Sequence, residues 1–165
     1  MPIPCRRLLV QATALSLFFV SGTALADRPV WVPIAELLVG SIGEADPARM
    51  SDVMSRCSAL NMTLAGLAGS YSPEMSETYQ NEALRLIQHG IMIESNMEQT
   101  RTGIEADIPA LSDVAVEKVK TLLNGYNLWI DDNMANSESY FSKEFDMEID
   151  SCRLASRMMN QMAAG

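Results

Sequence analysis

Apolar residues recur every three to four positions along most of this chain, the spacing typical of amphipathic helices. No segment shows the strict apolar–polar alternation of a half-buried strand. The apolar stripes predict four helices, within residues 47–71, 73–103, 116–134 and 138–163. Asp46-Pro47 and Ser72-Pro73 mark the starts of the first two, because an N-capping side chain followed by proline favours a helix start.

The connections between these stripes are short. The longest is "GIEADIPALSD", residues 103–113, where Pro109 predicts a loop, and a weaker break falls around Asn136-Ser137. Four helices with short loops predict an all-α, antiparallel up-down-up-down bundle. Residues 31–43, "WVPIAELLVGSIG", predict a short extra N-terminal helix that begins near Pro33 and packs across one end of the bundle.

The first 26 residues follow the three-part layout of a secretory signal peptide. Arg6 and Arg7 precede an apolar run that is shorter than the about 20 residues of a membrane-spanning helix, and small residues end the segment. We therefore expect cleavage between Ala26 and Asp27 and a periplasmic or secreted protein. Residues 27–165 then form a single helical domain, with no membrane segment after cleavage. An uncleaved N-terminal anchor is the alternative.

Acidic residues outnumber basic ones, 21 to 12, which gives the whole chain a formal net charge of −9. The predicted leader holds two of the arginines and no acid, so residues 27–165 carry −11. Nucleic acid is therefore excluded as a partner, because its affinity depends on neutralising phosphates with Lys and Arg. An anionic membrane surface is disfavoured for the same reason.

Removal of the leader also removes Cys5 and leaves Cys57 and Cys152. In an up-down-up-down bundle the first and fourth helices are antiparallel neighbours, and these two cysteines then lie at the same level. Both also fall on the apolar stripe of their own helix. We predict a disulfide between them, as expected for two thiols in an exported chain. Two separately buried free thiols are the alternative.

Residue types that carry catalysis or bind cofactors are sparse. His89 is the single histidine, so sites built from two imidazoles of one chain are excluded. The chain contains no covalent haem motif, Glu-x-x-His pair, glycine-rich phosphate loop or calcium-loop spacing. The acidic stretch "KEFDMEID", residues 143–150, splits into carboxylate pairs on either side of Phe145. We therefore expect no cofactor, and we find no recognisable catalytic constellation.

Methionine is frequent, with 12 in the chain, and three close the sequence after Cys152. Thioether sulfur favours Cu(I), which makes copper binding a hypothesis for an exported protein. Met158 and Met162 are four residues apart and share one side of the last helix. Helical spacing instead places most methionines on apolar stripes, where they fill gaps in the core.

The last helix has a second apolar stripe opposite the Cys152 face. We call it the α-seam; its members are Tyr140, Met147, Leu154 and Met158. The first three are seven residues apart, as in a helix-pairing seam, so the α-seam predicts binding of a protein partner or a homodimer. The alternatives are docking of residues 31–43 onto this face, or scattered surface apolar residues.

These observations predict an exported, non-catalytic helical-bundle protein that binds a protein partner or self-associates through the last helix. The alternative function is soft-metal binding, with copper held by surface methionines. The sequence does not identify a small ligand.

Overall fold

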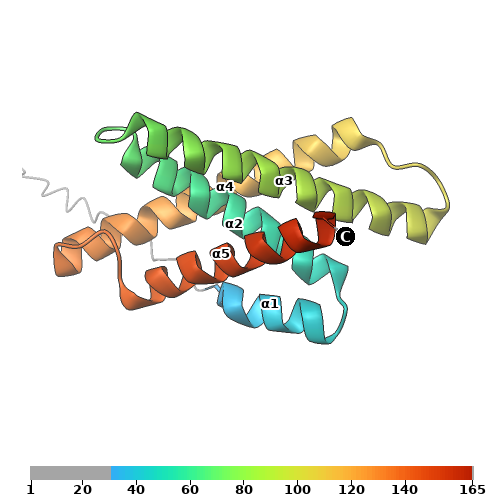
Figure 1. The fold of residues 1–165 in the computed structure, drawn as a ribbon, viewed down its shortest axis with the longest axis horizontal. Coiled ribbons are helices and arrows are strands. Elements are labelled where there is room, and N and C mark those ends of the chain that lie inside the picture. The colour runs from blue at the N-terminus through green and yellow to red at the C-terminus, as the bar shows by residue number, and fades with distance from the viewer. Residues whose placement is uncertain (1–30, 165) are drawn as a thin grey trace, which may run out of the picture.

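The computed structural model describes residues 31–164, and the side chains of residues 31–161 (Figure 1). The predicted signal peptide and its cleavage site, Ala26-Asp27, lie outside these residues. Within residues 31–164 the chain forms helices and no strand, so the predicted all-α bundle with a short extra helix is confirmed. The helices are α1 (Ile34–Gly43), α2 (Pro47–Ala68), α3 (Pro73–Thr102), α4 (Ile108–Ser137) and α5 (Lys143–Ala164).

Side-chain caps start four of these helices, all except α1. The Asp46 carboxylate accepts hydrogen bonds from the backbone N–H of Ala48 and Arg49, as the sequence predicted for the start of α2. The Ser72 hydroxyl caps α3 in the same way through the N–H of Met75, at 3.3 Å. These bonds satisfy donors that the first turn of a helix leaves without an intrahelical partner.

Two predicted helix starts were wrong. The sequence placed Pro109 in a loop, whereas it occupies the first turn of α4, behind the capping carboxylate of Asp107. Proline is tolerated there because the N–H that it lacks has no helical partner. The last helix begins at Lys143 rather than near 138, after a left-handed residue, Glu138, ends α4.

Helix α2 is the centre of the bundle and contacts each of the other four helices. In Figure 1, α3 runs antiparallel to α2, α4 crosses behind them, and α5 returns along the front above α1. Small residues let α2 and α3 approach closely: a Cβ on Gly90 would lie 3.4 Å from the Cβ of Met54. Two buried serines then bridge the pair, Ser58 donating to the carbonyl of Ala83 and Ser76 to that of Ala65.

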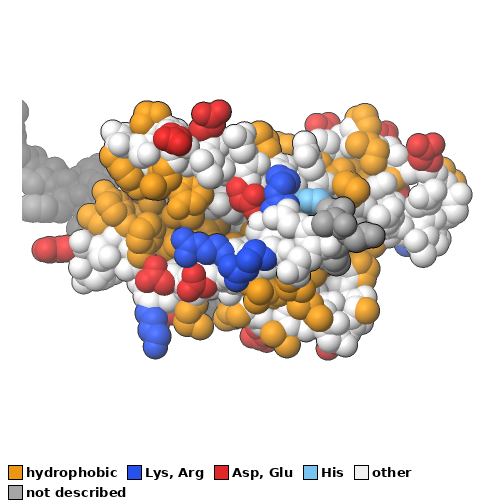
Figure 2. Space-filling model, in the orientation of Figure 1, with side chains coloured by type: hydrophobic (Ala, Val, Ile, Leu, Met, Phe, Trp, Pro, Cys, Tyr) orange, Lys and Arg blue, Asp and Glu red, His pale blue; other side chains and the backbone are white. Residues whose placement is uncertain are grey.

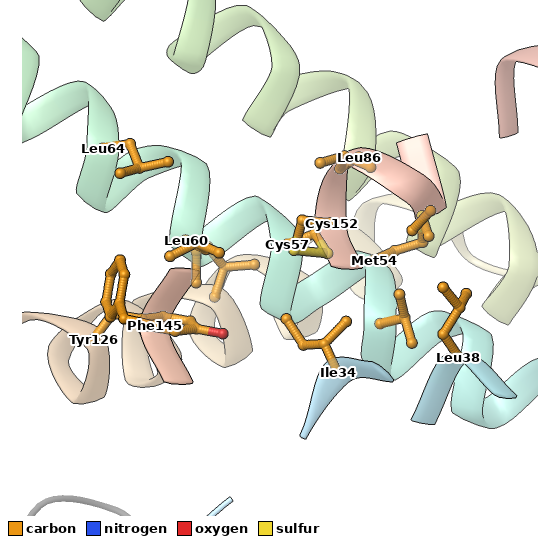
Figure 3. Packing of buried hydrophobic residues seen from close by; sticks show 14 of the residues in the cluster. Ile34, Leu38, Met54, Cys57, Leu60, Leu64, Leu86, Tyr126, Phe145 and Cys152 are labelled. Carbon is orange, nitrogen blue, oxygen red and sulfur yellow. A yellow bond between two sulfur atoms is a disulfide. The ribbon is translucent and has the colours of Figure 1, made fainter. Parts of the chain in front are cut away.

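The hydrophobic core surrounds α2 (Figure 3). Ile34 and Leu38 bring α1 into this core, where α1 contacts α2 and α5. Aromatic rings join α4 to α5, with the centroids of Trp129 and Phe145 5.2 Å apart. Edge-to-face ring packing of this kind adds about 0.5–1.5 kcal/mol to the stabilisation from burial.

The predicted disulfide between Cys57 and Cys152 is confirmed. It joins the middle of α2 to the middle of α5, with the two Cα atoms 5.3 Å apart. Both cysteines are buried, and they lie within the core cluster (Figure 3). The covalent bond therefore joins the two helices through cysteines that are 95 residues apart in the sequence.

Candidate functional site

A groove of about 570 Å³ runs between α2, α3 and α5. We call it the α5 groove. Its size falls in the range of ligand pockets, about 300–1,000 Å³. On the face shown in Figure 2, Lys and Arg side chains gather over α5 and beside α3, next to an apolar area. The lining comprises Leu60, Asn61, Leu64, Thr78, Tyr79, Asn81, Glu82, Arg85, Ile149, Cys152, Arg153, Ser156 and Arg157.

The floor of the α5 groove is apolar and belongs to the core. Leu60 and Leu64 of α2 are buried beneath it, and Cys152 of the disulfide also lines it. Tyr79 and Ile149 are partly buried and pack against the core from the two walls. The α5 groove therefore offers a ligand an apolar surface that the disulfide holds in place.

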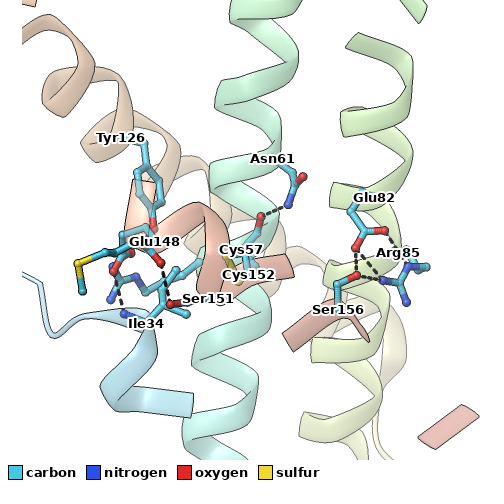
Figure 4. Close-up of a disulfide and its surroundings, with 12 residues drawn as sticks. Ile34, Cys57, Asn61, Glu82, Arg85, Tyr126, Glu148, Ser151, Cys152 and Ser156 are labelled. Atoms are coloured by element: carbon cyan, nitrogen blue, oxygen red, sulfur yellow. Dashed lines mark hydrogen bonds and ion pairs between the residues drawn. A yellow bond between two sulfur atoms is a disulfide. The ribbon is translucent and has the colours of Figure 1, made fainter. Parts of the chain in front are cut away.

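A polar cluster bridges the two walls of the α5 groove (Figure 4). Arg85 of α3 donates two hydrogen bonds to the Glu82 carboxylate, at 3.0 and 2.7 Å, and a third to the hydroxyl of Ser156 on α5. Ser156 in turn donates to Glu82. The Arg85 guanidinium, and then the Ser156 hydroxyl, lower the pKa of Glu82 because they stabilise its ionised form.

The remaining bonds of Arg85 also lie within this cluster. Its second terminal nitrogen donates to the side-chain oxygen of Asn160 at 2.7 Å and lies 3.4 Å from the His89 ring. Arg85 is therefore committed to the protein, whereas the two other arginines of the groove, Arg153 and Arg157, lie at its exposed edge on α5. Arg153 pairs with Asp150 in the preceding turn at 3.0 Å.

A second polar cluster lies on the other side of the disulfide (Figure 4). Arg56 of α2 and Glu148 of α5 form an ion pair there, and only 7% and 6% of their side chains are exposed. The Tyr126 hydroxyl of α4 donates to the same carboxylate at 3.0 Å, and the backbone N–H of Ile34 donates to its other oxygen at 2.8 Å. The cluster thus joins α1, α2, α4 and α5.

Most polar atoms of this second cluster hydrogen-bond to one another, whereas the buried Nε of Arg56 has no hydrogen-bond partner among the described residues. Burial raises the pKa of the Tyr126 phenol far above its usual value, so this hydroxyl remains a donor. Arg56 also donates to the carbonyl of Val32 and stacks on the Trp31 ring, 5.0 Å from its centroid. We interpret this cluster as a set of contacts that stabilises the packing of the helices rather than as a binding site.

A larger hollow, of about 720 Å³, lies where the end of α3 meets the starts of α2 and α4. Its charged lining consists of Glu94, Glu98 and Arg101, so it is slightly acidic like the chain as a whole. Its charge therefore does not differ in sign from that of the whole chain and gives no indication of a ligand, in contrast to the α5 groove.

The α-seam is only partly a helical face. Tyr140 lies in the connection before α5, whereas Met147 and Leu154 lie on α5 with 54% and 45% of their surface exposed. Met158 is partly buried and packs against the core. Helix α1 does contact α5, but Met147 and Leu154 remain exposed beside it. Binding of a partner through the α-seam stays a prediction.

The methionine site of the copper hypothesis also stays a prediction. Met158 contacts the core, and the side chain of Met162 lies outside the described residues. Among the residues that the structure describes, no group of three or more His, Cys, Asp or Glu side chains is arranged to hold a metal ion.

Neither polar cluster was predicted from the sequence. Glu148 was grouped with the neighbouring carboxylates of α5, and Arg56, Glu82 and Ser156 were not singled out. One signal was present: Arg56 precedes Cys57 directly, and Glu148 lies one helical turn before Cys152. Once the cysteines are paired, these two oppositely charged residues lie near the disulfide on neighbouring helices, but the sequence does not specify that their side chains meet.

Within residues 31–164, none of the helices has the length and apolar character needed to cross a membrane. Comparison of the chain with protein-family models, with curated proteins and with solved structures finds no match.

Proposed function

We propose that this protein is an exported, non-catalytic binding protein and that the α5 groove is its binding site. The observation that carries this proposal is the combination of an apolar floor with arginines at the rim, in a chain whose formal net charge is −9. Ligand sites commonly combine an apolar lining with a few polar groups that orient the ligand. The leader-like pattern of residues 1–26 supports export.

The walls of the α5 groove are held in place before any ligand binds. The Cys57–Cys152 disulfide, the buried Arg56–Glu148 pair and the hydrogen bonds of Ser156 all attach α5 to the bundle. A site that needs little ordering upon binding retains more of its interaction energy as affinity. We therefore expect a ligand to bind in the groove without a large rearrangement of the helices.

Native mass spectrometry of the protein purified from the periplasm, without added metal or reductant, tests this proposal. We expect a chain of residues 27–165 less two hydrogens, together with an organic adduct that is lost in the variant Asn81→Trp. Asn81 is an exposed residue that lines the groove, so an indole there fills its mouth. Leu84→Trp, on the same helix but outside the groove, is the matched control.

An adduct that persists in Asn81→Trp would place the binding site elsewhere. An added mass matching copper, lost in Met158→Leu, would instead favour the soft-metal function. The absence of any adduct in the wild type, together with unchanged behaviour of Asn81→Trp in a ligand screen, would contradict the groove as a binding site.

The α-seam supports a second candidate function, self-association through α5. Met147 and Leu154 are half exposed on one side of this helix, which is the observation that favours it. We expect Leu154→Glu to lower the oligomeric mass in analytical ultracentrifugation while thermal stability stays unchanged. If both the mass and the stability are unchanged, this face is not used for association.

A further inference from the structure

We propose that the ligand of the α5 groove is a single-tailed amphipathic carboxylate, with its apolar tail along the floor and its carboxylate at Arg157. This inference rests on the proposed function, because it names the ligand class of the same site. Three properties of the groove support it: the local charge, the availability of one arginine, and the length of the apolar floor.

The charge of the lining is opposite to that of the chain. Three arginines and one glutamate line the α5 groove, a surplus of two positive charges, whereas the whole chain carries −9. Clefts lined by one sign of charge attract ligands of the opposite sign. A small surplus of this size suits a singly charged head group better than a multiply charged one.

The three arginines are not equally available to a ligand. Arg85 is held by Glu82, Ser156 and Asn160, and Arg153 pairs with Asp150. For Arg157, no hydrogen bond or ion pair occurs with any residue that the structure describes. A guanidinium binds a carboxylate through two parallel N–H···O bonds, so Arg157 is suited to the head group.

The apolar floor extends away from Arg157 towards the start of α5. On this helix the lining runs from Ile149 to Arg157, a span of eight residues or about 12 Å. Leu60 and Leu64 of α2 lie beneath it, and Tyr79 of α3 adds an aromatic side chain to the lining. Arg157 thus lies at one end of a mainly apolar floor, which matches the polarity of a medium-chain carboxylate. Asn61, Thr78, Asn81 and the paired Arg153 add polar groups along the walls.

Isothermal titration calorimetry with defined probes tests this assignment. The probe is decanoate, below the concentration at which it forms micelles. Acetate provides the head without the tail, and decyltrimethylammonium provides the same tail with a positive head. The protein is the disulfide-bonded chain of residues 27–165, as wild type and as the variants Arg157→Glu and Asn81→Trp. Their matched controls are Lys143→Glu, an exposed charge reversal on the same helix outside the groove, and Leu84→Trp.

We expect decanoate to bind, acetate and decyltrimethylammonium to bind at least tenfold more weakly, and affinity to rise about fourfold with each methylene buried when shorter chains are compared. Arg157→Glu should weaken decanoate binding about tenfold, because it replaces an attraction by a repulsion. Asn81→Trp should abolish binding, and both control variants should bind as the wild type does.

Equal binding of the anionic and cationic probes, or no effect of Arg157→Glu, would overturn the carboxylate assignment. If Asn81→Trp still abolished binding in that case, the α5 groove would remain a binding site and the proposed function would stand. Ultracentrifugation of the same samples covers another occupant. A ligand-free dimer that Asn81→Trp converts to monomer would assign the groove to a second copy of the chain and overturn the inference.

Discussion

Arg56 on α2 and Glu148 on α5 form a buried ion pair beside the disulfide that joins the same two helices. Arg56 adjoins Cys57, and Glu148 lies one turn before Cys152. A charge buried without its partner is costly, so this pair favours the arrangement in which α5 is docked at this level on α2. The covalent and the ionic contact thus specify the same register.

Removal of one member of this pair should be strongly destabilising. We expect Arg56→Met or Glu148→Leu alone to lower the free energy of unfolding by about 3–5 kcal/mol, because each leaves an uncompensated buried charge. The double variant should lose less than the sum of the two. Urea denaturation of the four proteins in a double-mutant cycle measures the coupling.

The exposed pair Lys120–Glu117 is the control for this cycle, with 62% and 72% of the two side chains exposed. Its coupling should not exceed about 1 kcal/mol. Coupling of similar size in both pairs would contradict the structural role assigned to Arg56 and Glu148.

The disulfide should stabilise the folded protein by an amount comparable to the loss expected when one member of the Arg56–Glu148 pair is removed. Replacing Cys57 and Cys152 together by alanine removes a closed loop of nearly the whole bundle, so we expect a loss of about 4–5 kcal/mol in the chain-entropy model. Guanidinium denaturation of residues 27–165 measures it. Unfolded, unreduced wild-type protein should react with no thiol reagent, and two equivalents of reaction would show free cysteines.

The Glu82 carboxylate should make stability depend on pH. Its hydrogen bonds with Arg85 and Ser156 lower its pKa in the folded protein below the ordinary 4.5. The stabilisation is therefore complete above pH 4.5 and is lost as the pH falls through the lowered folded-state pKa. We expect Glu82→Gln to cost about 1 kcal/mol at neutral pH and progressively less in acid.

Urea denaturation across this pH range, with wild type and Glu82→Gln compared at each pH, checks the sign. Glu77→Gln, an exposed carboxylate change on the same helix, is the control and should show no such convergence. A difference between wild type and Glu82→Gln that grows in acid would contradict the assigned hydrogen bonds.

Replacing either of two glycines by alanine should change the stability of the protein, in opposite directions at the two positions. Gly66 lies exposed inside α2 with open space around its missing Cβ, so Gly66→Ala should stabilise the protein by about 0.5–1 kcal/mol. Gly103 ends α3 with φ of 70°, so Gly103→Ala should destabilise it by about 1 kcal/mol. Thermal melting of both variants distinguishes the two effects. Equal shifts would contradict the helix end at Gly103.

Local signals in the sequence determined the helices. Capping residues, prolines and apolar periodicity act within a few residues of the positions that they specify, so the starts of α2 and α3 were predictable from Asp46 and Ser72. The start of α4 was not, because proline both breaks a helix and favours its first turn, and Pro109 does the latter. The Cys57–Cys152 pairing was also predictable, since antiparallel neighbours place level residues side by side.

The sequence by itself therefore determined the helical class of this protein, its extra N-terminal helix and the disulfide between α2 and α5. Only the tertiary structure decided that Glu148 is buried with Arg56, and that Arg85, Ser156 and Arg157 share one groove. The physical reason is the distance along the sequence over which each interaction acts. Helix formation depends on neighbours three and four residues apart, whereas the charge and the shape of the groove arise from side chains that only the packing of α2, α3 and α5 brings together.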